Sequence, residues 1–255
     1  MSSEIIILCI AAFAAGFIDA IVGGGGLVQT PAVLVTLPQY PVATLLGTTK
    51  IPSFTGTSIA SYQYAKKIKL QWRLAFIMCG IAMFAAVTGS YCVSIISNRF
   101  MKPIIFCVLI AVAVYTYTKK NFGTAASKEL HSKHELLYGA SFALAIGFYD
   151  GFIGPGAGSF LVLFFISALG FDFLKASAHA KFVNLATNAG SIIYFGGTGH
   201  ILCHYAISMA VFNFIGSLIG ARLALIRGNA FIRIFFLFVV AGTIIRFGYD
   251  IFFRH

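Results

Sequence analysis

The sequence predicts an all-α polytopic membrane protein built from two pseudo-symmetric repeats that are inverted relative to each other. Three observations predict this class. The 255 residues are 59% hydrophobic and only 10% charged, whereas soluble domains average about 45–50% and 25%. The apolar runs are continuous and about 20 residues long, as membrane-spanning helices require, and they lack the alternating pattern of barrel strands. A glycine-rich motif occurs twice, which indicates an internal duplication.

The duplicated motif reads GFIDAIVGGGG at positions 16–26 and GFYDGFIGPGA at positions 147–157, a shift of 131. The same shift, without a gap, pairs Lys50 with Lys181 and Gly89 with Gly220. Each half therefore has an aspartate, a glycine-rich break and, 31 positions after the aspartate, a lysine. We expect residues 1–118 and 136–255 to form two membrane repeats, joined by a hydrophilic cytoplasmic connector at 119–135.

In the first repeat, residues 5–22 form an apolar segment that runs into four glycines, and residues 27–37 continue it for only 11 positions. Glycine runs weaken helices, and irregular backbone is tolerated at membrane depth where protein surrounds it. We therefore expect a re-entrant pair of half-helices with an unwound joint. Three spanning helices should follow, at 42–65, 74–97 and 101–118.

The second repeat has the same order of elements. Residues 136–153 run into a joint at 154–158, and residues 159–169 supply the short partner of the re-entrant pair. Its three spanning helices are predicted at 176–195, 205–225 and 231–253.

The basic residues indicate the orientation. If each broken segment enters and leaves by the same face, twelve Lys and Arg residues lie in connections on one face, and Arg99, Lys102 and Arg254 lie on the other. The positive-inside rule then places the first face in the cytoplasm and both termini outside the cell inner membrane. If each broken segment instead crossed once, the halves would be parallel. We favour the inverted arrangement, which many transporters share.

Two lysines lie inside apolar segments, where an uncompensated charge costs at least about 2.5–3.5 kcal/mol. One interpretation is an ion pair within each half, Asp19 with Lys50 and Asp150 with Lys181. The other is that both lysines face a shared central cavity and neutralise an anionic substrate. The two are compatible if the carboxylate competes with the substrate for the ammonium.

The glycine joints favour the anion interpretation. An interrupted helix exposes unpaired N–H groups at the start of its second half, with about half a positive charge. Such an end binds anions, and glycine lets a ligand approach the backbone closely. The alternative is that the glycines only let helices pack closely. The candidate binding residues are Gly24, Gly25, Gly26 and Leu27 in the first half and Gly156, Ala157, Gly158 and Ser159 in the second.

Polar side chains near the lysines are further candidates for the substrate site. Hydroxyls and amides donate to oxyanions without adding another charge, although Ser and Thr often bond to their own helix. His179 can titrate near neutral pH, so it joins Asp19 and Asp150 as a candidate for coupling to protons or another ion, unless it is buried and neutral. The polar candidates are Thr48, Thr49 and Ser53 in the first half, and Asn184 and Asn188 in the second.

Other function classes find little support. The net charge of +11 comes from Lys and Arg clustered in short connections, so nucleic acid is not an expected partner. His200, Cys203 and His204 have no acidic neighbour, and the five cysteines are scattered, so no metal or other cofactor is expected. No nucleophile lies beside a base, which disfavours an intramembrane enzyme. An anion channel remains the nearest alternative to a carrier.

These motifs resemble the TauE/SafE family of sulfite-exporter-like permeases, most closely its YfcA-type branch. The resemblance is carried by the first glycine motif, by GFYDGFIGPGAGSF at 147–160 and by KASAHAK at 175–181. It implies an inner-membrane secondary transporter of duplicated design that exports small anions such as sulfite, sulfonates or sulfoacetate. Pro155 stands where the first joint has Gly24, so the two joints are not expected to be identical. The expected partners are a small anion and the lipid bilayer, and self-association into homo-oligomers is left open.

Overall fold

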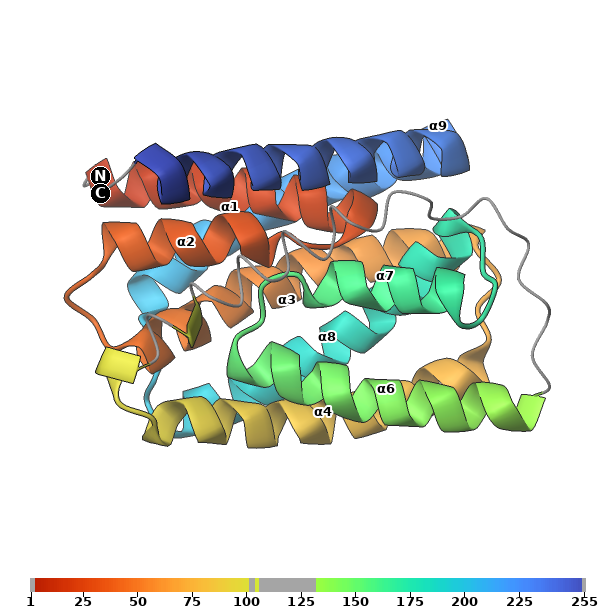
Figure 1. Cartoon of the computed structure of the whole chain (residues 1–255), viewed down its shortest axis with the longest axis horizontal. Helices are drawn as coiled ribbons and strands as arrows, with labels where there is room; N and C mark the ends of the chain where they lie inside the picture. Colours follow the sequence, from red (N-terminus) through yellow and green to blue (C-terminus); the bar gives the residue numbers. More distant parts are fainter. Residues whose placement is uncertain (1–2, 101–103, 106–131, 254–255) are drawn as a thin grey trace.

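A computed structural model describes residues 3–100, 104–105 and 132–253 of the chain. In these ranges the protein is a bundle of helices without strands (Figure 1). The spanning helix expected at 101–118 and most of the connector expected at 119–135 lie outside the described residues. The helices are α1 (Ser3–Val22), α2 (Gly26–Thr36), α3 (Val42–Lys67), α4 (Trp72–Ile95), α6 (Ser132–Phe152), α7 (Ala157–Ser167), α8 (Phe173–Gly197) and α9 (Cys203–Phe253).

Glycine determines where these helices break. Gly23 and Gly24, between α1 and α2, have φ angles of 77° and 87°, and Gly154 and Gly156, between α6 and α7, have φ angles of 92° and 85°. Only glycine adopts this left-handed conformation readily. Both breaks therefore occur where the glycine-rich motifs predict them. Gly228 (φ 73°) interrupts α9 in the same way, and the chain doubles back there (Figure 1).

Each short helix returns toward the end of the molecule from which its long partner started. In Figure 1, α1 starts at the left end and α2 returns to it, whereas α6 starts at the right end and α7 returns to it. One hydrogen bond links elements at each end of the bundle. The Tyr205 hydroxyl of α9 donates to Glu4 at the start of α1, and at the other end the Gln71 N–H, just before α4, donates to His179 of α8. The two re-entrant pairs thus lie in opposite directions within one bundle.

The long helices pack mainly against helices of the other half. α1 lies along α9 and α6 along α4, while α3 and α8 meet each other and also contact α9 and α4 respectively. Glycines allow the close approach: a Cβ on Gly220 would lie 2.5 Å from the Phe17 carbonyl oxygen, and one on Gly89 would lie 2.2 Å from that of Phe148. Gly89 and Gly220 are equivalent positions of the two repeats, and so are Phe148 and Phe17, so the two contacts are equivalent. The contacts between the halves therefore follow the repeat.

The outer surface of the bundle is apolar. Large side chains such as Phe76, Phe84 and Ile193 are exposed, which is typical of a surface that meets lipid. Among the described residues, three helical stretches are long and apolar enough to cross a membrane: Ser3–Val22, Trp72–Ile95 and Cys203–Ile232. The other long helices, α3 and α8, are less apolar because they carry the polar residues of the centre.

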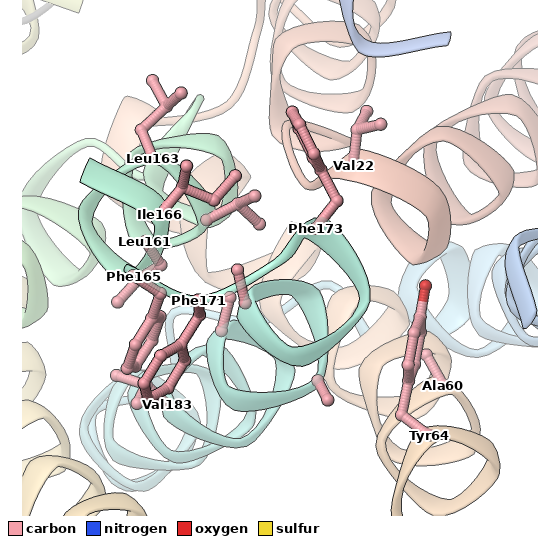
Figure 2. Packing of buried hydrophobic residues seen from close by; sticks show 14 of the residues in the cluster. Val22, Ala60, Tyr64, Leu161, Leu163, Phe165, Ile166, Phe171, Phe173 and Val183 are labelled. Atoms are coloured by element: carbon pink, nitrogen blue, oxygen red, sulfur yellow. The ribbon is translucent and has the colours of Figure 1, made fainter. Parts of the chain in front are cut away.

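The largest core cluster lies toward one end of the molecule and joins α7 and α8 to α1, α3, α4, α6 and α9. Figure 2 shows Phe165, Phe171 and Val183 packed together there, and Tyr64 projecting from α3 on the other side of α8. The basic residues gather at the same end: Lys66 and Lys67 close α3, Lys69 and Arg73 follow, Lys175 lies in the first turn of α8, and Arg227 precedes the break in α9. These six are among the twelve basic residues that the sequence assigns to one face.

Candidate functional site

The two glycine joints touch at the centre of the bundle. A Cβ on Gly23 would lie 2.4 Å from the carbonyl carbon of Gly158, and one on Gly26 would lie 3.1 Å from the Cα of Pro155. A side chain at Gly23 would therefore push the backbones apart. Because the joints meet here, α2 and α7 both begin at this point, with their positive amino ends close together.

Each buried lysine pairs with the aspartate of the other half. The Lys50 Nζ lies 3.0 Å from the Asp150 Oδ1 and also donates to the Asp150 carbonyl. The Lys181 Nζ lies 2.9 Å from the Asp19 Oδ2 and also donates to the Asp19 carbonyl. The expected pairing within each half, Asp19 with Lys50 and Asp150 with Lys181, is wrong. The reason is the contact between the joints, which brings the end of α6 beside α3 and the end of α1 beside α8.

Each ammonium also stabilises the carboxyl end of a broken helix. Asp19 and Asp150 lie in the last turn of α1 and α6, where the carbonyl ends of the aligned peptides carry about half a negative charge. A cation that bonds to such a carbonyl caps the helix. Each ammonium has three N–H donors and uses two of them on its aspartate. Among the described residues the third donor of Lys50 and that of Lys181 have no partner, so they can bind another ligand.

A cavity of about 40 Å³ lies beside the touching joints. A water molecule needs roughly 10–15 Å³ on such a measure, so the cavity has room for only a few heavy atoms. Most of the predicted site residues line it: Lys50, Asp19, Asp150, Gly24, Gly25, Gly26, Gly156, Ala157, Gly158, Thr49, Ser53, Asn184 and Asn188.

Five predicted site residues do not line the cavity, and one of them, Leu27 in the first turn of α2, packs against an apolar cluster instead. Lys181 is only 1% exposed and reaches the site through its pair with Asp19. Ser159 lies at the contact between the joints, where a Cβ on Gly24 would be 2.7 Å from its hydroxyl oxygen. The other two are Thr48 and His179.

Thr48 and His179 hold the ends of helices instead. The Thr48 hydroxyl donates to the Thr44 carbonyl and accepts the N–H of Leu202 at 3.0 Å. The fully buried His179 accepts the Gln71 N–H at 2.9 Å through Nε2, and its Nδ1 lies 2.8 Å from the Lys175 carbonyl. A neutral imidazole with its proton on Nδ1 satisfies both contacts. His179 therefore matches the buried, neutral interpretation.

Backbone donors surround the cavity. At the first joint the Gly25 N–H points to the Asp19 carboxylate at 3.3 Å. Among the described residues, the N–H groups of Gly26 and Gly158, which line the cavity in the first turns of α2 and α7, have no hydrogen-bond partner. The first turn of a helix leaves such donors unpaired. They are the groups that an oxyanion binds at a helix start.

The sequence did not indicate three polar residues that line the cavity, Gln29, Thr30 and Asn213. The Gln29 Nε2 donates to the Thr49 carbonyl at 3.0 Å, and the Gln29 Oε1 accepts the Asn213 amide at 3.0 Å. The repeat gives no signal for them, because the shift of 131 replaces Gln29 by phenylalanine and Asn213 by alanine. The sequence did contain one signal for Gln29 and Asn213: each places a side-chain amide inside an apolar segment, which is rare without a function.

The charges of the site balance before an ion binds. The two ammonium groups and the two carboxylates cancel, and the positive starts of α2 and α7 offset the negative ends of α1 and α6. What the site offers to an anion is a set of donors, to which the hydroxyls and amides of the wall belong. The site can therefore hold a small anion against unpaired N–H groups and the remaining ammonium donor of Lys50.

Known proteins with similar sequences share most of the chain. The family described as "Sulfite exporter TauE/SafE" matches residues 8–247. "Probable membrane transporter protein ORF9" of Sinorhizobium sp is 35% identical over 240 residues, which cover 94% of this chain and 90% of that protein. A "Probable membrane transporter protein" of Haemophilus influenzae is 34% identical over 229 residues, which cover 89% and 88% of the two chains. "Probable membrane transporter protein YfcA" of Escherichia coli K12 is 31% identical over 248 residues, 96% of this chain and 89% of that protein. No solved structure matches the chain.

Proposed function

The chain belongs to the sulfite exporter TauE/SafE family, and from this premise we propose that it is a secondary transporter of small anions in the cell inner membrane. Relatives that match about nine-tenths of the chain or more are named as probable membrane transporters. Their names point to transport and away from an enzyme.

The observation that carries the proposal is the cavity beside the touching joints. It combines an ammonium, Lys50, with the starts of two helices and a wall of amides and hydroxyls. Anions bind at helix starts because the N–H groups there are unpaired and the dipole is positive. A buried cation inside an apolar bundle is costly, so its presence indicates a function of this kind.

The size of the cavity favours a compact oxyanion. Sulfite has four heavy atoms, which suits about 40 Å³ better than the longer sulfoacetate does. We propose a sulfite-sized, sulfur-containing oxyanion as the cargo, in agreement with the family's name. Amide and hydroxyl donors such as Asn184 and Ser53 would bind its oxygens without adding charge.

We further propose that the two halves are inverted in the bilayer, with the basic end in the cytoplasm. The opposite directions of the two re-entrant pairs support this, and so does the positive-inside rule. In a chain whose other four cysteines are replaced by alanine, the exposed Cys203 should react with a membrane-impermeant thiol reagent in intact cells. A chain with Lys69→Cys and all five native cysteines replaced should react only after the cells are opened. The reverse labelling pattern would contradict this orientation.

Counterflow in proteoliposomes tests the transport function. Vesicles loaded with unlabelled sulfite should transiently accumulate labelled sulfite from outside against its gradient, and the uptake should saturate. Lys50→Gln should reduce the uptake at least tenfold, whereas Lys67→Gln, at an exposed position at the end of α3, should not change it. Flux without saturation or counterflow would favour an anion channel. Unchanged counterflow in Lys50→Gln would show that the Lys50 ammonium does not bind the anion.

A further inference from the structure

The two buried ion pairs are equivalent by sequence but differ in their contacts. The Asp150 side chain is 6% exposed and the Asp19 side chain is 17% exposed. On Asp150, one carboxylate oxygen accepts Lys50 and the other accepts the hydroxyl of Thr187. On Asp19, one oxygen accepts Lys181 and the other accepts only a backbone N–H at 3.3 Å. Asp19 is therefore the less firmly held of the two carboxylates.

The residues behind this difference are fixed by the fold. Thr187 corresponds to Gly56 under the shift of 131, so the first half has no hydroxyl to donate to Asp19. The space beside Gly56 is filled by Asn213, because a Cβ on Gly56 would lie 1.9 Å from the Asn213 Oδ1. The Asn213 amide is bonded to Gln29. Asp19 therefore lacks this donor because of the residues at positions 56 and 213, and a rotation of a nearby side chain would not supply it.

The charge balance of the cavity requires a further positive charge when an anion binds. With both ion pairs formed, the four charges cancel, and both carboxylates lie on the cavity wall. An anion that enters would leave the centre of the bundle with an uncompensated negative charge, which is costly away from water. A proton on one carboxylate removes this excess. It also frees the ammonium partner of that carboxylate to face the anion.

We propose that Asp19 is the proton-binding site of this transporter, and that each anion crosses the membrane together with one proton held on Asp19. The proposal rests on the proposed anion transport. The Asp19 carboxylate takes the proton from water on the side where the anion enters, becomes a neutral acid and releases Lys181. It returns the proton to water on the other side. Asp150, held by both Lys50 and Thr187, stays ionised throughout.

The other groups that face Asp19 do not compete for this proton. The charged and titratable groups recorded near it among the described residues are Lys181 of α8, the Tyr64 hydroxyl of α3 and, across the cavity, Lys50 with Asp150. Tyr64 donates its hydroxyl to the Ala20 carbonyl at 3.0 Å. The joint before α2, and α7 and α9, present backbone groups and neutral side chains to the cavity.

A probe anion that carries no proton of its own makes the test decisive. Methanesulfonate is the anion of a strong acid and stays unprotonated at pH 5–8, so its own movement carries no proton. In proteoliposomes with a trapped pH dye, its inward gradient should acidify the lumen by about one proton per anion. Any exchange of labelled methanesulfonate that remains in the Asp19→Asn variant should not depend on pH and should not acidify the lumen. Asp150→Asn should not produce this uncoupled behaviour.

The outcomes separate this inference from the transport function. If the wild-type protein shows no counterflow of sulfite or methanesulfonate, the transport proposal fails. If it carries methanesulfonate without luminal acidification, transport stands and the proton site on Asp19 is overturned, whether or not any variant folds. Acidification that persists in Asp19→Asn, or that disappears only in Asp150→Asn, also overturns it. Asp19→Glu keeps a carboxylate, so it should restore acidification with a displaced pH dependence of the exchange rate.

Discussion

The backbones of Gly23 and Gly158 touch where the two joints meet, because a Cβ on Gly23 would lie 2.4 Å from the carbonyl carbon of Gly158. This contact brings the starts of α2 and α7 together at one cavity. It also places each aspartate beside the lysine of the other half. The candidate binding site is therefore a product of the contact between the halves.

Gly23→Ala should prevent this contact. Alanine would clash with Gly158 and would have to adopt a φ of 77°, which costs an L-residue about 1–2 kcal/mol before the clash is counted. We expect a lower Tm in detergent and loss of sulfite counterflow. Gly80→Ala is the matched control, because nothing lies within 4 Å of its added Cβ. That variant should be as stable as the wild type or more stable by about 0.5–1 kcal/mol, and equal losses in both variants would contradict the importance of the contact.

Lys50→Gln should destabilise the protein because it leaves Asp150 buried without its cation. Removing one partner of a buried pair typically costs about 3–5 kcal/mol. Adding Asp150→Asn should recover most of the stability, since no unpaired charge remains, but it should not recover transport. Thermal unfolding and counterflow of the single and double variants measure the two effects separately. Recovery of transport in the double variant would show that the pair is only structural.

Asn213→Ala should weaken anion binding without unfolding the bundle. It removes the donor to the side-chain oxygen Oε1 of Gln29, and it removes from the cavity wall an amide that can donate to the anion, a hydrogen bond worth about 1.5–3 kcal/mol when the acceptor is charged. The half-saturating sulfite concentration should rise by about 10- to 150-fold. Asn229→Ala is the control, since Asn229 accepts the Leu174 N–H at the basic end, away from the cavity. Similar affinities for both variants would exclude Asn213 from the site.

His179→Ala should lower stability but leave the pH dependence of transport unchanged. His179 joins the connection between α3 and α4 to α8 through its two ring nitrogens, and the loss of a buried hydrogen-bond partner costs about 1–3 kcal/mol. The measurements are Tm in detergent and exchange rates between pH 5 and 8. A flattened pH profile in His179→Ala would instead make this histidine the coupling residue.

The sequence predicted the parts of the fold that depend on local chemistry. Glycine runs determine where α1 and α6 end, and continuous apolar segments determine the long helices, so both were predicted within a few residues. The repeat also indicated most of the residues that line the cavity. It failed where the two halves differ: Gln29 and Asn213 have apolar counterparts, and a search for repeated polar residues passes over them.

The pairing of the buried charges was not predictable from the repeat. Asp19 and Lys50 are 31 positions apart in one half and look like natural partners. The shift of 131 shows which residues of the two halves are equivalent. It does not show whether each half pairs its own charges or pairs them with the other half. Only the contact between the joints decides that Lys50 meets Asp150 and Lys181 meets Asp19.

The crossed ion pairs have a consequence for how the protein is made. When the first half leaves the ribosome, Lys50 and Asp19 enter the bilayer before their final partners have been synthesised. Each must be sheltered by temporary neighbours, by water or by the insertion machinery until the second half arrives. Neither half therefore completes its assembly alone, and two halves expressed as separate polypeptides should reach a stable fold only when they are produced in the same cell.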